Sequence, residues 1–344
     1  MCQPNTVAYM TEVRYLTSED VVDLADINDY VEAAHDGFRQ RGEGADADNP
    51  DKSANKDSNV AVISYAASLP DDGVLGGYIF STGDSVDGWY VTTLFDSTDG
   101  TPLAIIDGGS WNPYKTGSAG GVGVDVLSRP DVDSIGVIGS GSQARAQLEA
   151  INCVREFETV EVFSPTKAHR EEFASDMNSS LDARVMAVDS TEEAIADSDI
   201  LVVATKASGP VFDGDLLEPG MHVNAVGQEK VDVTTIQRGK YIPDHRGRGL
   251  SGHSSLAEYI EEGTLSASDL HAELGDVVVG NTPGRESDDD ITVFDSSGTG
   301  IETIAAGNML YERALEHDRG STVTVTPASE GFVMSDFVKA YQLD

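Results

Sequence analysis

The chain has 344 residues, enough for about two domains, and carries 60 Asp and Glu against 22 Lys and Arg, a formal net charge of -38. A surface this acidic repels nucleic acid and anionic membranes, so neither is an expected partner. The sequence has two cysteines, no apolar run of membrane-spanning length and no signal-peptide pattern. It therefore predicts a cytoplasmic protein without a disulfide framework.

The first third of the chain is predicted to form a helix followed by a small sheet. Asp26 suits a helix N-cap, and apolar residues repeat at helical spacing within residues 13–41. The polar segment 42–59 is predicted to be a loop. Strand-like runs with turn signals then follow without intervening helices, which indicates an antiparallel sheet or partial barrel. These runs are residues 60–66, 77–81, 90–96 and 103–106.

From about residue 116 onward, strands alternate with helices, which predicts an α/β fold with a doubly wound parallel sheet of the Rossmann type. The predicted strands are residues 134–139, 159–164, 199–205, 222–226, 240–243, 277–279 and 292–295. The predicted helices are residues 144–153, 168–177, 191–196, 256–262 and 296–315. We expect the last helix to carry the chain back to the first domain.

The most informative motif is Gly139-x-Gly141-x-x-Ala144, which follows an apolar strand. Gly139 permits a tight turn, Gly141 lets a pyrophosphate approach the backbone, and Ala144 lets helix and strand pack closely. The helix would begin near Ser142 and Gln143, where backbone N–H groups favour an anion. The motif predicts a nicotinamide dinucleotide site, and the alternative is a purely structural glycine turn.

The second strand of a dinucleotide-binding fold usually ends in an acid that bonds the ribose 2′-hydroxyl. Here the strand is followed by Ser164, Thr166 and Lys167. Hydroxyl and cationic groups suit a 2′-phosphate, so the sequence favours NADP(H) over NAD(H) as the cofactor. Alternatively, Lys167 and Arg170 are solvated residues at the start of a helix.

Further cofactor contacts are expected where later strands end in polar loops at the carboxyl edge of the sheet. We assign Thr205, Lys206 and Val226 to the cofactor site. Asp295 and Ser296 are assigned to it as well, with helix N-capping as the competing role.

Glu229 is a candidate general base because it follows a predicted strand and a glycine. Chance placement is the alternative, since the chain has 60 acids. The seven histidines show no metal-ligand spacing, so no metal site is predicted.

Residues 107–121, 139–144 and 219–227, supported by 291–298, resemble in this order the ornithine cyclodeaminase/mu-crystallin family. Its members include archaeal-type alanine dehydrogenases and ketimine reductases. The resemblance implies a homodimer in which both chain ends form a substrate-binding and dimerisation α+β domain. This domain would comprise residues 1–122 and 312–344, and the dinucleotide-binding domain residues 123–311.

The resemblance also implies hydride transfer between a nicotinamide and the Cα of a small α-imino or α-amino acid. Where the family has a carboxylate-binding Arg, this chain has Lys115, beside the expected cofactor contact Thr116. A lysine keeps the charge but lacks the bidentate fork of arginine. Glu229 stands where some members have Asp, and the family's substrate-facing Lys has no clear counterpart in residues 60–66.

Two alternative functions remain, and these departures disfavour the first of them. One is an ornithine cyclodeaminase, which converts L-ornithine to L-proline and ammonia with catalytic NAD+. The other is a homologue that binds the cofactor without turnover.

The acidic balance favours adaptation to molar salt over an ordinary mesophilic protein. Screening at about 1 M salt shortens the Debye length to about 3 Å and removes most self-repulsion. We therefore expect the purified protein to lose structure on dialysis to low salt, measured by circular dichroism. An unchanged spectrum would contradict this interpretation.

Overall fold

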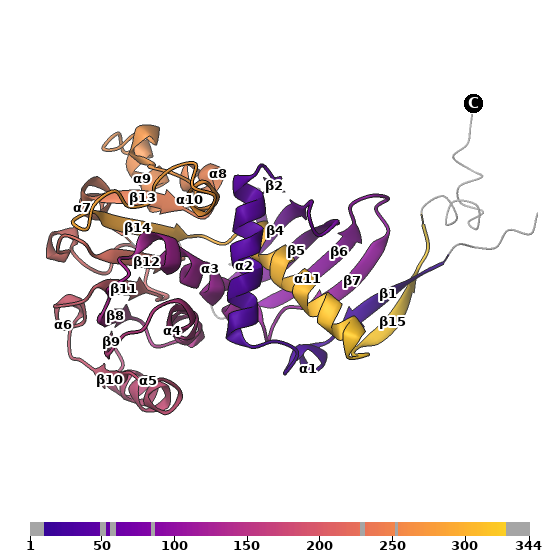
Figure 1. The fold of residues 1–344 in the computed structure, drawn as a ribbon, viewed down its shortest axis with the longest axis horizontal. Helices are drawn as coiled ribbons and strands as arrows, with labels where there is room; N and C mark the ends of the chain where they lie inside the picture. The colour runs from indigo at the N-terminus through magenta and orange to yellow at the C-terminus, as the bar shows by residue number, and fades with distance from the viewer. Residues whose placement is uncertain are drawn as a thin grey trace, which may run out of the picture.

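The computed structural model describes residues 10–48, 53–55, 60–83, 87–227, 231–251 and 254–327. Two sheets with their own covering helices lie side by side (Figure 1). The first and last described strands pair with each other at the far edge of one sheet. Within the described residues, no helix has the length and apolar character needed to span a membrane.

One sheet has eight strands in the order β15-β1-β7-β6-β5-β4-β2, with β3 also paired to β4. All neighbouring strands are antiparallel except β1 and β7. This arrangement confirms the predicted antiparallel sheet and joins both chain ends in it. The strands are β1 (Thr11–Leu16), β2 (Ala47–Asp48), β3 (Ser53–Asn55), β4 (Val60–Leu69), β5 (Val74–Gly83), β6 (Trp89–Asp96), β7 (Pro102–Asp107) and β15 (Ser321–Val325).

Helices α2 (Ile27–Gly42) and α11 (Gly300–Glu316) lie across one face of this sheet, and the short α1 (Ser18–Val21) lies at its edge (Figure 1). Asp26 caps α2 as predicted, because its side chain accepts the N–H groups of Asn28 and Asp29. Alternate strand residues such as Leu94 and Ile106 point into the core that α11 covers. The segment predicted to be a loop, 42–59, contributes β2 and β3.

The second sheet has seven parallel strands in the order β10-β9-β8-β11-β12-β14-β13, which confirms the predicted doubly wound sheet. They are β8 (Ser134–Ile138), β9 (Thr159–Phe163), β10 (Arg184–Ala187), β11 (Ile200–Val203), β12 (His222–Val226), β13 (Gly239–Pro243) and β14 (Ile291–Ser296). The order reverses between β8 and β11. A crevice at the carboxyl ends of the strands beside such a reversal is the expected ligand site of this fold.

The helices of this half surround the parallel sheet (Figure 1). They are α3 (Asn112–Leu127), α4 (Ser142–Val154), α5 (Lys167–Ser180), α6 (Thr191–Ile195), α7 (Val233–Arg238), α8 (Arg246–Gly249), α9 (Ser255–Glu261) and α10 (Leu274–Val278). Short 3₁₀ turns occupy Gly214–Leu216 and Ala267–Asp269.

The prediction of a strand at residues 277–279 is wrong, because they lie in or next to α10. Consecutive valines favour a strand locally, but here α10 packs on α2. A Cβ on Gly42 would lie 2.1 Å from the Gly275 carbonyl oxygen, so the two backbones touch. Glu273, which precedes α10, forms a 2.6 Å ion pair with Arg41 of α2. These contacts to α2 hold the segment as a helix.

The sequence pattern did not predict α3 as a helix, since its 16 residues include four glycines. The structure gives three of these glycines, Gly117, Gly120 and Gly121, a packing role against α4. A Cβ on Gly117 would lie 2.6 Å from the Ala146 carbonyl oxygen, and one on Gly120 only 1.7 Å from the Gln147 side chain. Glycine therefore lets α3 approach α4 closely, which brings Lys115 and the adjoining Thr116 beside the start of α4.

Candidate active site

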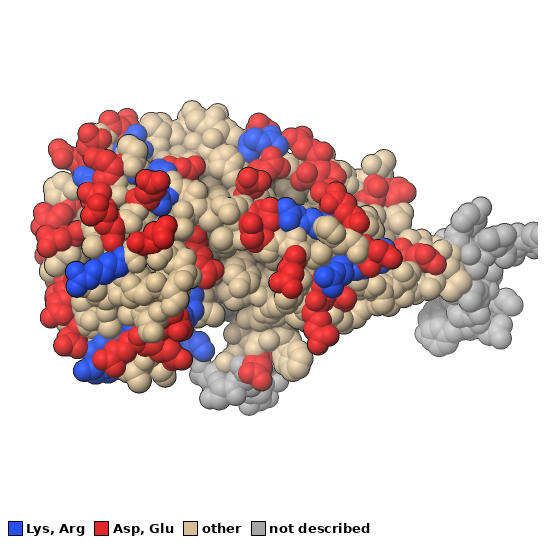
Figure 2. All heavy atoms as spheres, turned by 60° about the horizontal axis from the view of Figure 1, so that its bottom comes forward, with Lys and Arg blue, Asp and Glu red and all other residues tan. Residues whose placement is uncertain are grey.

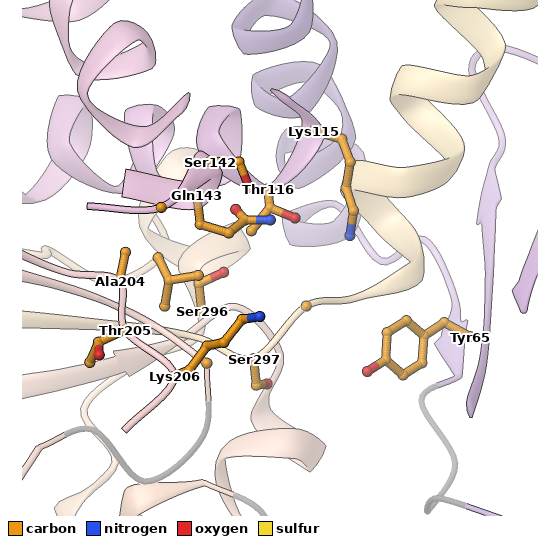
Figure 3. A pocket seen from close by; sticks show the side chains of 14 residues that line it. Tyr65, Lys115, Thr116, Ser142, Gln143, Ala204, Thr205, Lys206, Ser296 and Ser297 are labelled. Atoms are coloured by element: carbon orange, nitrogen blue, oxygen red, sulfur yellow. The ribbon is translucent and has the colours of Figure 1, made fainter. Parts of the chain in front are cut away.

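A cavity opens at the carboxyl ends of β8, β11, β12 and β14 and reaches α3 and β4 (Figure 3). It lies next to the strand-order reversal. Its lining residues are Tyr65, Lys115, Thr116, Gly141, Ser142, Gln143, Ala204, Thr205, Lys206, Val226, Gly227, Ser296, Ser297 and Gly298. The two sheets thus contribute to one site.

The amino terminus of α4 forms one wall of this cavity. Gly139 has φ +121°, and a Cβ there would lie 2.1 Å from the Ala204 carbonyl oxygen, so the turn requires glycine. Gly141 is the N-cap and provides no side-chain hydrogen bond, and a Cβ on it would meet no atom within 4 Å. The first-turn N–H groups near Ser142 and Gln143 therefore face open space, which fits a dinucleotide pyrophosphate.

Lys115 projects from α3 into the other side of the cavity (Figure 3). Its side chain is 4% exposed, and its Nζ lies 3.3 Å from Glu302 Oε1 and 5.2 Å from the centroid of the Tyr78 ring. Glu302 is buried at the start of α11, where Oε1 also accepts the Thr299 backbone N–H at 2.8 Å. Lys115 is therefore a buried cation with one carboxylate partner and room to contact a second anion in the cavity.

The turn that follows β14 is held by a buried carboxyl group. Asp244 accepts the backbone N–H of Gly298 at 2.7 Å and the hydroxyl of Ser297 at 3.3 Å. Burial, with Glu302 and Asp295 nearby, raises the pKa of Asp244 to about 8. Asp244 thereby fixes two residues of the cavity wall without lining it.

The structure brings nine of the predicted site residues into the cavity lining, namely Lys115, Thr116, Gly141, Ser142, Gln143, Thr205, Lys206, Val226 and Ser296. Gly139 and the buried Ala144 lie in the turn and helix that support it. Asp295 is buried beneath the cavity and accepts a hydrogen bond from Tyr241. Thr299, rather than Asp295 or Ser296, caps α11. Glu229 lies outside the described residues.

The remaining predicted cofactor residues lie at the end of β9, the strand adjacent to β8. The Ser164 hydroxyl accepts from Ser140 at 2.9 Å, and Thr166 is the N-cap of α5. Arg170 is occupied, since it donates to the Ser164 carbonyl oxygen and to Asp189. The Lys167 side chain is 71% exposed and has only a long contact of 3.7 Å with Glu171.

Sequence reasoning did not assign Tyr65, Ala204, Gly227, Ser297 or Gly298 to the site, although all line the cavity. Four of them adjoin predicted cofactor residues in the same loops. Tyr65 alone comes from the other sheet. It was not predicted because strand alternation shows which side chains point inward but not which of them reaches a cavity. Among the described residues, no group of three or more His, Cys, Asp or Glu side chains is arranged to hold a metal ion.

Comparisons with known proteins agree with this geometry. Residues 85–318 match the ornithine cyclodeaminase/mu-crystallin family. A Delta(1)-pyrroline-2-carboxylate reductase from Bacillus cereus is 34% identical over 68% of this chain and 73% of its own length.

Two solved structures share the fold over nearly the whole chain. One is a Delta(1)-pyrroline-2-carboxylate reductase from Thermococcus litoralis in complex with NADH and L-proline. It is 30% identical, has a TM-score of 0.86, and covers 90% of this chain and 100% of its own. The other is an archaeal alanine dehydrogenase dimer with bound NAD, 27% identical, with a TM-score of 0.84 over 91% and 99% of the two chains. The protein studied here therefore belongs to the ornithine cyclodeaminase/mu-crystallin family.

Proposed function

We propose that the protein is an NAD(P)(H)-dependent oxidoreductase that interconverts a small α-imino acid and the corresponding α-amino acid. One observation carries this proposal: the buried cation of Lys115 shares a cavity with the open amino terminus of α4. A dinucleotide seated at that terminus has a cationic anchor for a substrate carboxylate within the same cavity. The printed functions of the reductase and dehydrogenase relatives support the same reaction class.

The residues around the cavity divide into two groups in this proposal. The first-turn N–H groups near Ser142 and Gln143 hold the pyrophosphate. Thr205, Lys206 and Ser296, at the ends of neighbouring strands, border the rest of the dinucleotide. The bound reduced cofactor supplies hydride to the substrate carbon.

Lys115 is proposed to orient the substrate by its carboxylate. A point charge on a flexible stem attracts the carboxylate but leaves its orientation to the surrounding walls. Because Glu302 already neutralises part of that charge, carboxylate affinity is expected to be moderate. Glu229 lies outside the described residues and stays a candidate general base.

The cyclodeaminase alternative is less well supported by the site. The resemblance leads us to expect a substrate-facing lysine on a strand of the first sheet, and β4 instead presents Tyr65. A phenol does not replace an ammonium group in a reaction that needs a fixed amine–base arrangement. Turnover with net loss of reduced nicotinamide absorbance distinguishes the reductase from both the cyclodeaminase and a non-catalytic homologue.

The functional test uses cyclic imino acids, keto acids with ammonia, and L-ornithine, each with NADH and NADPH in high salt. We expect net oxidation of reduced cofactor with at least one imino acid. Replacing Lys115 by Met is expected to raise KM for that substrate roughly 10- to 100-fold, because a charged hydrogen bond contributes about 1.5–3 kcal/mol. Unaltered kinetics in K115M would contradict the assignment.

A conservative variant controls for the buried Glu302 that K115M leaves unpaired. K115R keeps the cation. Its KM and its midpoint of thermal unfolding are expected to stay close to those of the wild type. Turnover of ornithine without net cofactor change would instead support the cyclodeaminase.

We propose NADP(H) as the preferred cofactor, because the loop after β9 offers an exposed cation and no acid. Lys167 is exposed beside Thr166 and Ser164, whereas Arg170 is engaged by protein groups. A 2′-phosphate placed there meets an ammonium group and the Thr166 hydroxyl, whereas the buried Ser164 hydroxyl is bonded to Ser140 and Thr166.

Replacing Lys167 by Glu is expected to lower kcat/KM with NADPH roughly 10-fold, since about 1–1.5 kcal/mol is typical for one exposed charge contact to phosphate. The value with NADH serves as the internal control and is expected to stay unchanged. Equal catalytic efficiency of the wild type with both cofactors would contradict the preference.

We also propose that the protein is a cytoplasmic homodimer whose interface is the uncovered face of the eight-stranded sheet. The proposed dimerisation domain keeps the predicted ranges 1–122 and 312–344, whose limits fall within α3 and α11. The face carries exposed apolar residues, including Val62 (43% exposed), Ile79 (48%) and Val91 (38%). Helices α2 and α11 lie on the opposite face of the sheet (Figure 1).

The chemistry of this face contrasts with the rest of the surface. Figure 2 shows acidic side chains spread over the visible face of both halves, with few basic ones among them. An exposed apolar patch on so acidic a protein marks an interaction surface. The archaeal alanine dehydrogenase relative is itself described as a dimer.

Replacing Ile79 by Asp is expected to convert a dimer into a monomer, because it places a charge in the apolar interface. Light scattering coupled to size exclusion in high salt measures the mass. The matched control is V22D, which changes an apolar residue of 51% exposure next to α1 and is expected to stay dimeric. A monomeric wild type, or a dimeric I79D, would contradict the proposed interface.

A further inference from the structure

Tyr65 presents an unpaired hydroxyl to the cavity. Its ring packs in a cluster with Tyr78 (6.2 Å between centroids) and Phe80 (5.8 Å) on the inner face of the sheet. The hydroxyl of Tyr78 donates to Asn112 at 2.8 Å, whereas that of Tyr65 has no hydrogen-bond partner among the described residues. Figure 3 shows the Tyr65 side chain reaching from the right toward the turn that contains Ser297. The hydroxyl is therefore available to a ligand.

A buried guanidinium lies over the ring of this tyrosine. The Arg248 guanidinium carbon is 5.7 Å from the centroid of the Tyr65 ring, and the residue is 2% exposed. Its Nε, Nη1 and Nη2 atoms are all buried and have no hydrogen-bond partner in the part of the chain that the structure describes. The buried carboxyl groups of Asp244 and Asp295 interact with this charge through space, but neither accepts a hydrogen bond from it. Because an unbonded buried guanidinium is costly, its N–H groups are available to an anion that forms nearby.

Reduction of a carbon–nitrogen double bond needs a proton as well as a hydride. Among the described cavity residues, Lys115, Lys206 and Tyr65 are the ones with a titratable side-chain proton. Lys115 is paired with Glu302 and proposed above to hold the carboxylate. Lys206 follows β11 beside the dinucleotide loops, whereas Tyr65 comes from the opposite sheet. A substrate between the dinucleotide and β4 therefore meets Tyr65 on the side away from the cofactor.

We propose that the Tyr65 hydroxyl donates the proton to the imine nitrogen and that Arg248 stabilises the resulting phenolate. This assignment rests on the proposed reductase function. The imine carbon accepts the hydride that the reduced dinucleotide supplies, and the π electron pair of the C=N bond moves to nitrogen. Nitrogen forms a bond to the Tyr65 proton, the O–H electron pair stays on oxygen, and water later returns a proton to the phenolate.

The surroundings keep Tyr65 protonated before reaction. Burial raises the pKa of its hydroxyl to about 12, Arg248 opposes this increase, and Asp244 and Glu302 add to it. These groups come from α8, from the end of β13 and from α11, and Lys115 of α3 offsets Glu302. Tyr65 is therefore a neutral donor over the whole range in which the enzyme would be assayed.

The test compares the pH dependence of kcat/KM for a cyclic imino acid in the wild type, Y65F and the matched control Y90F. Tyr90 belongs to the same aromatic cluster but does not line the cavity. Below the pKa of the imine itself, the substrate already carries the proton, so Y65F is expected to match the wild type. Above it, kcat/KM of Y65F is expected to fall roughly 100-fold or more, and Y90F to follow the wild type.

Arg248 is tested as a positioning residue by R248M and R248K. R248M is expected to lower kcat/KM in the same alkaline range only, and R248K to recover most of it. Fluorescence titration with NADPH is expected to give the wild-type Kd for Y65F and R248M, which excludes a folding defect.

Four results would overturn the assignment. Y65F could follow the wild-type profile at every pH, or R248M could lose activity equally at all pH values, as a structural role requires. An alkaline loss seen in E229Q and absent in Y65F would place the donor at Glu229. A wild type that turns over no imino acid would overturn the proposed function and this assignment together. An active wild type whose pH profile is shared by Y65F would overturn this assignment alone.

Discussion

The close contact between α3 and α4 determines the geometry of the whole site. Gly117 and Gly120 let the two helices touch where any side chain would overlap Ala146 or Gln147. This contact places Lys115 beside the free amino terminus of α4. In the proposed function, α3 thus supplies the cation for the substrate and α4 the N–H groups for the dinucleotide. Without that approach the two anion-binding features would lie in separate parts of the molecule.

The charges near the cavity form a mixed buried layer rather than a single ion pair. Lys115 and Arg248 are accompanied by Glu302, Asp244 and Asp295, all nearly inaccessible to water. Burial raises the pKa of Asp295 to about 6 as well as that of Asp244. When one of the three carboxyl groups is protonated, the charges of the two cations are balanced by the two remaining carboxylates. In a chain that is strongly acidic overall, this local balance keeps the site able to attract an anionic substrate.

The sequence predicted the parallel sheet well because its strands are short apolar runs separated by helical periods and clear turn signals. It also located the tight turn after β8, where Gly139 has the positive φ that the motif requires. It did not predict α3, whose glycines are unfavourable for a helix in isolation and are explained only by the packing of α4. The same limitation applies to residues 277–279, where contact with α2 outweighs local strand preference.

Prediction of the site was partial for a related reason. Thr205, Val226 and Ser296 were found because strand ends in a parallel sheet meet at one edge. Tyr65 and its contact with Arg248 were not predicted, because they join an antiparallel strand to a short helix whose relative positions depend on how the two sheets pack. Only tertiary structure shows that the two side chains stack.

The most direct test of this geometry is a crystal structure of the protein with NADPH and the amino acid product of its reaction. The expected result has the pyrophosphate on the N–H groups near Ser142, the product carboxylate on Lys115, and its Cα facing the nicotinamide. A pyrophosphate bound away from α4, or a carboxylate without contact to Lys115, would contradict the central claim.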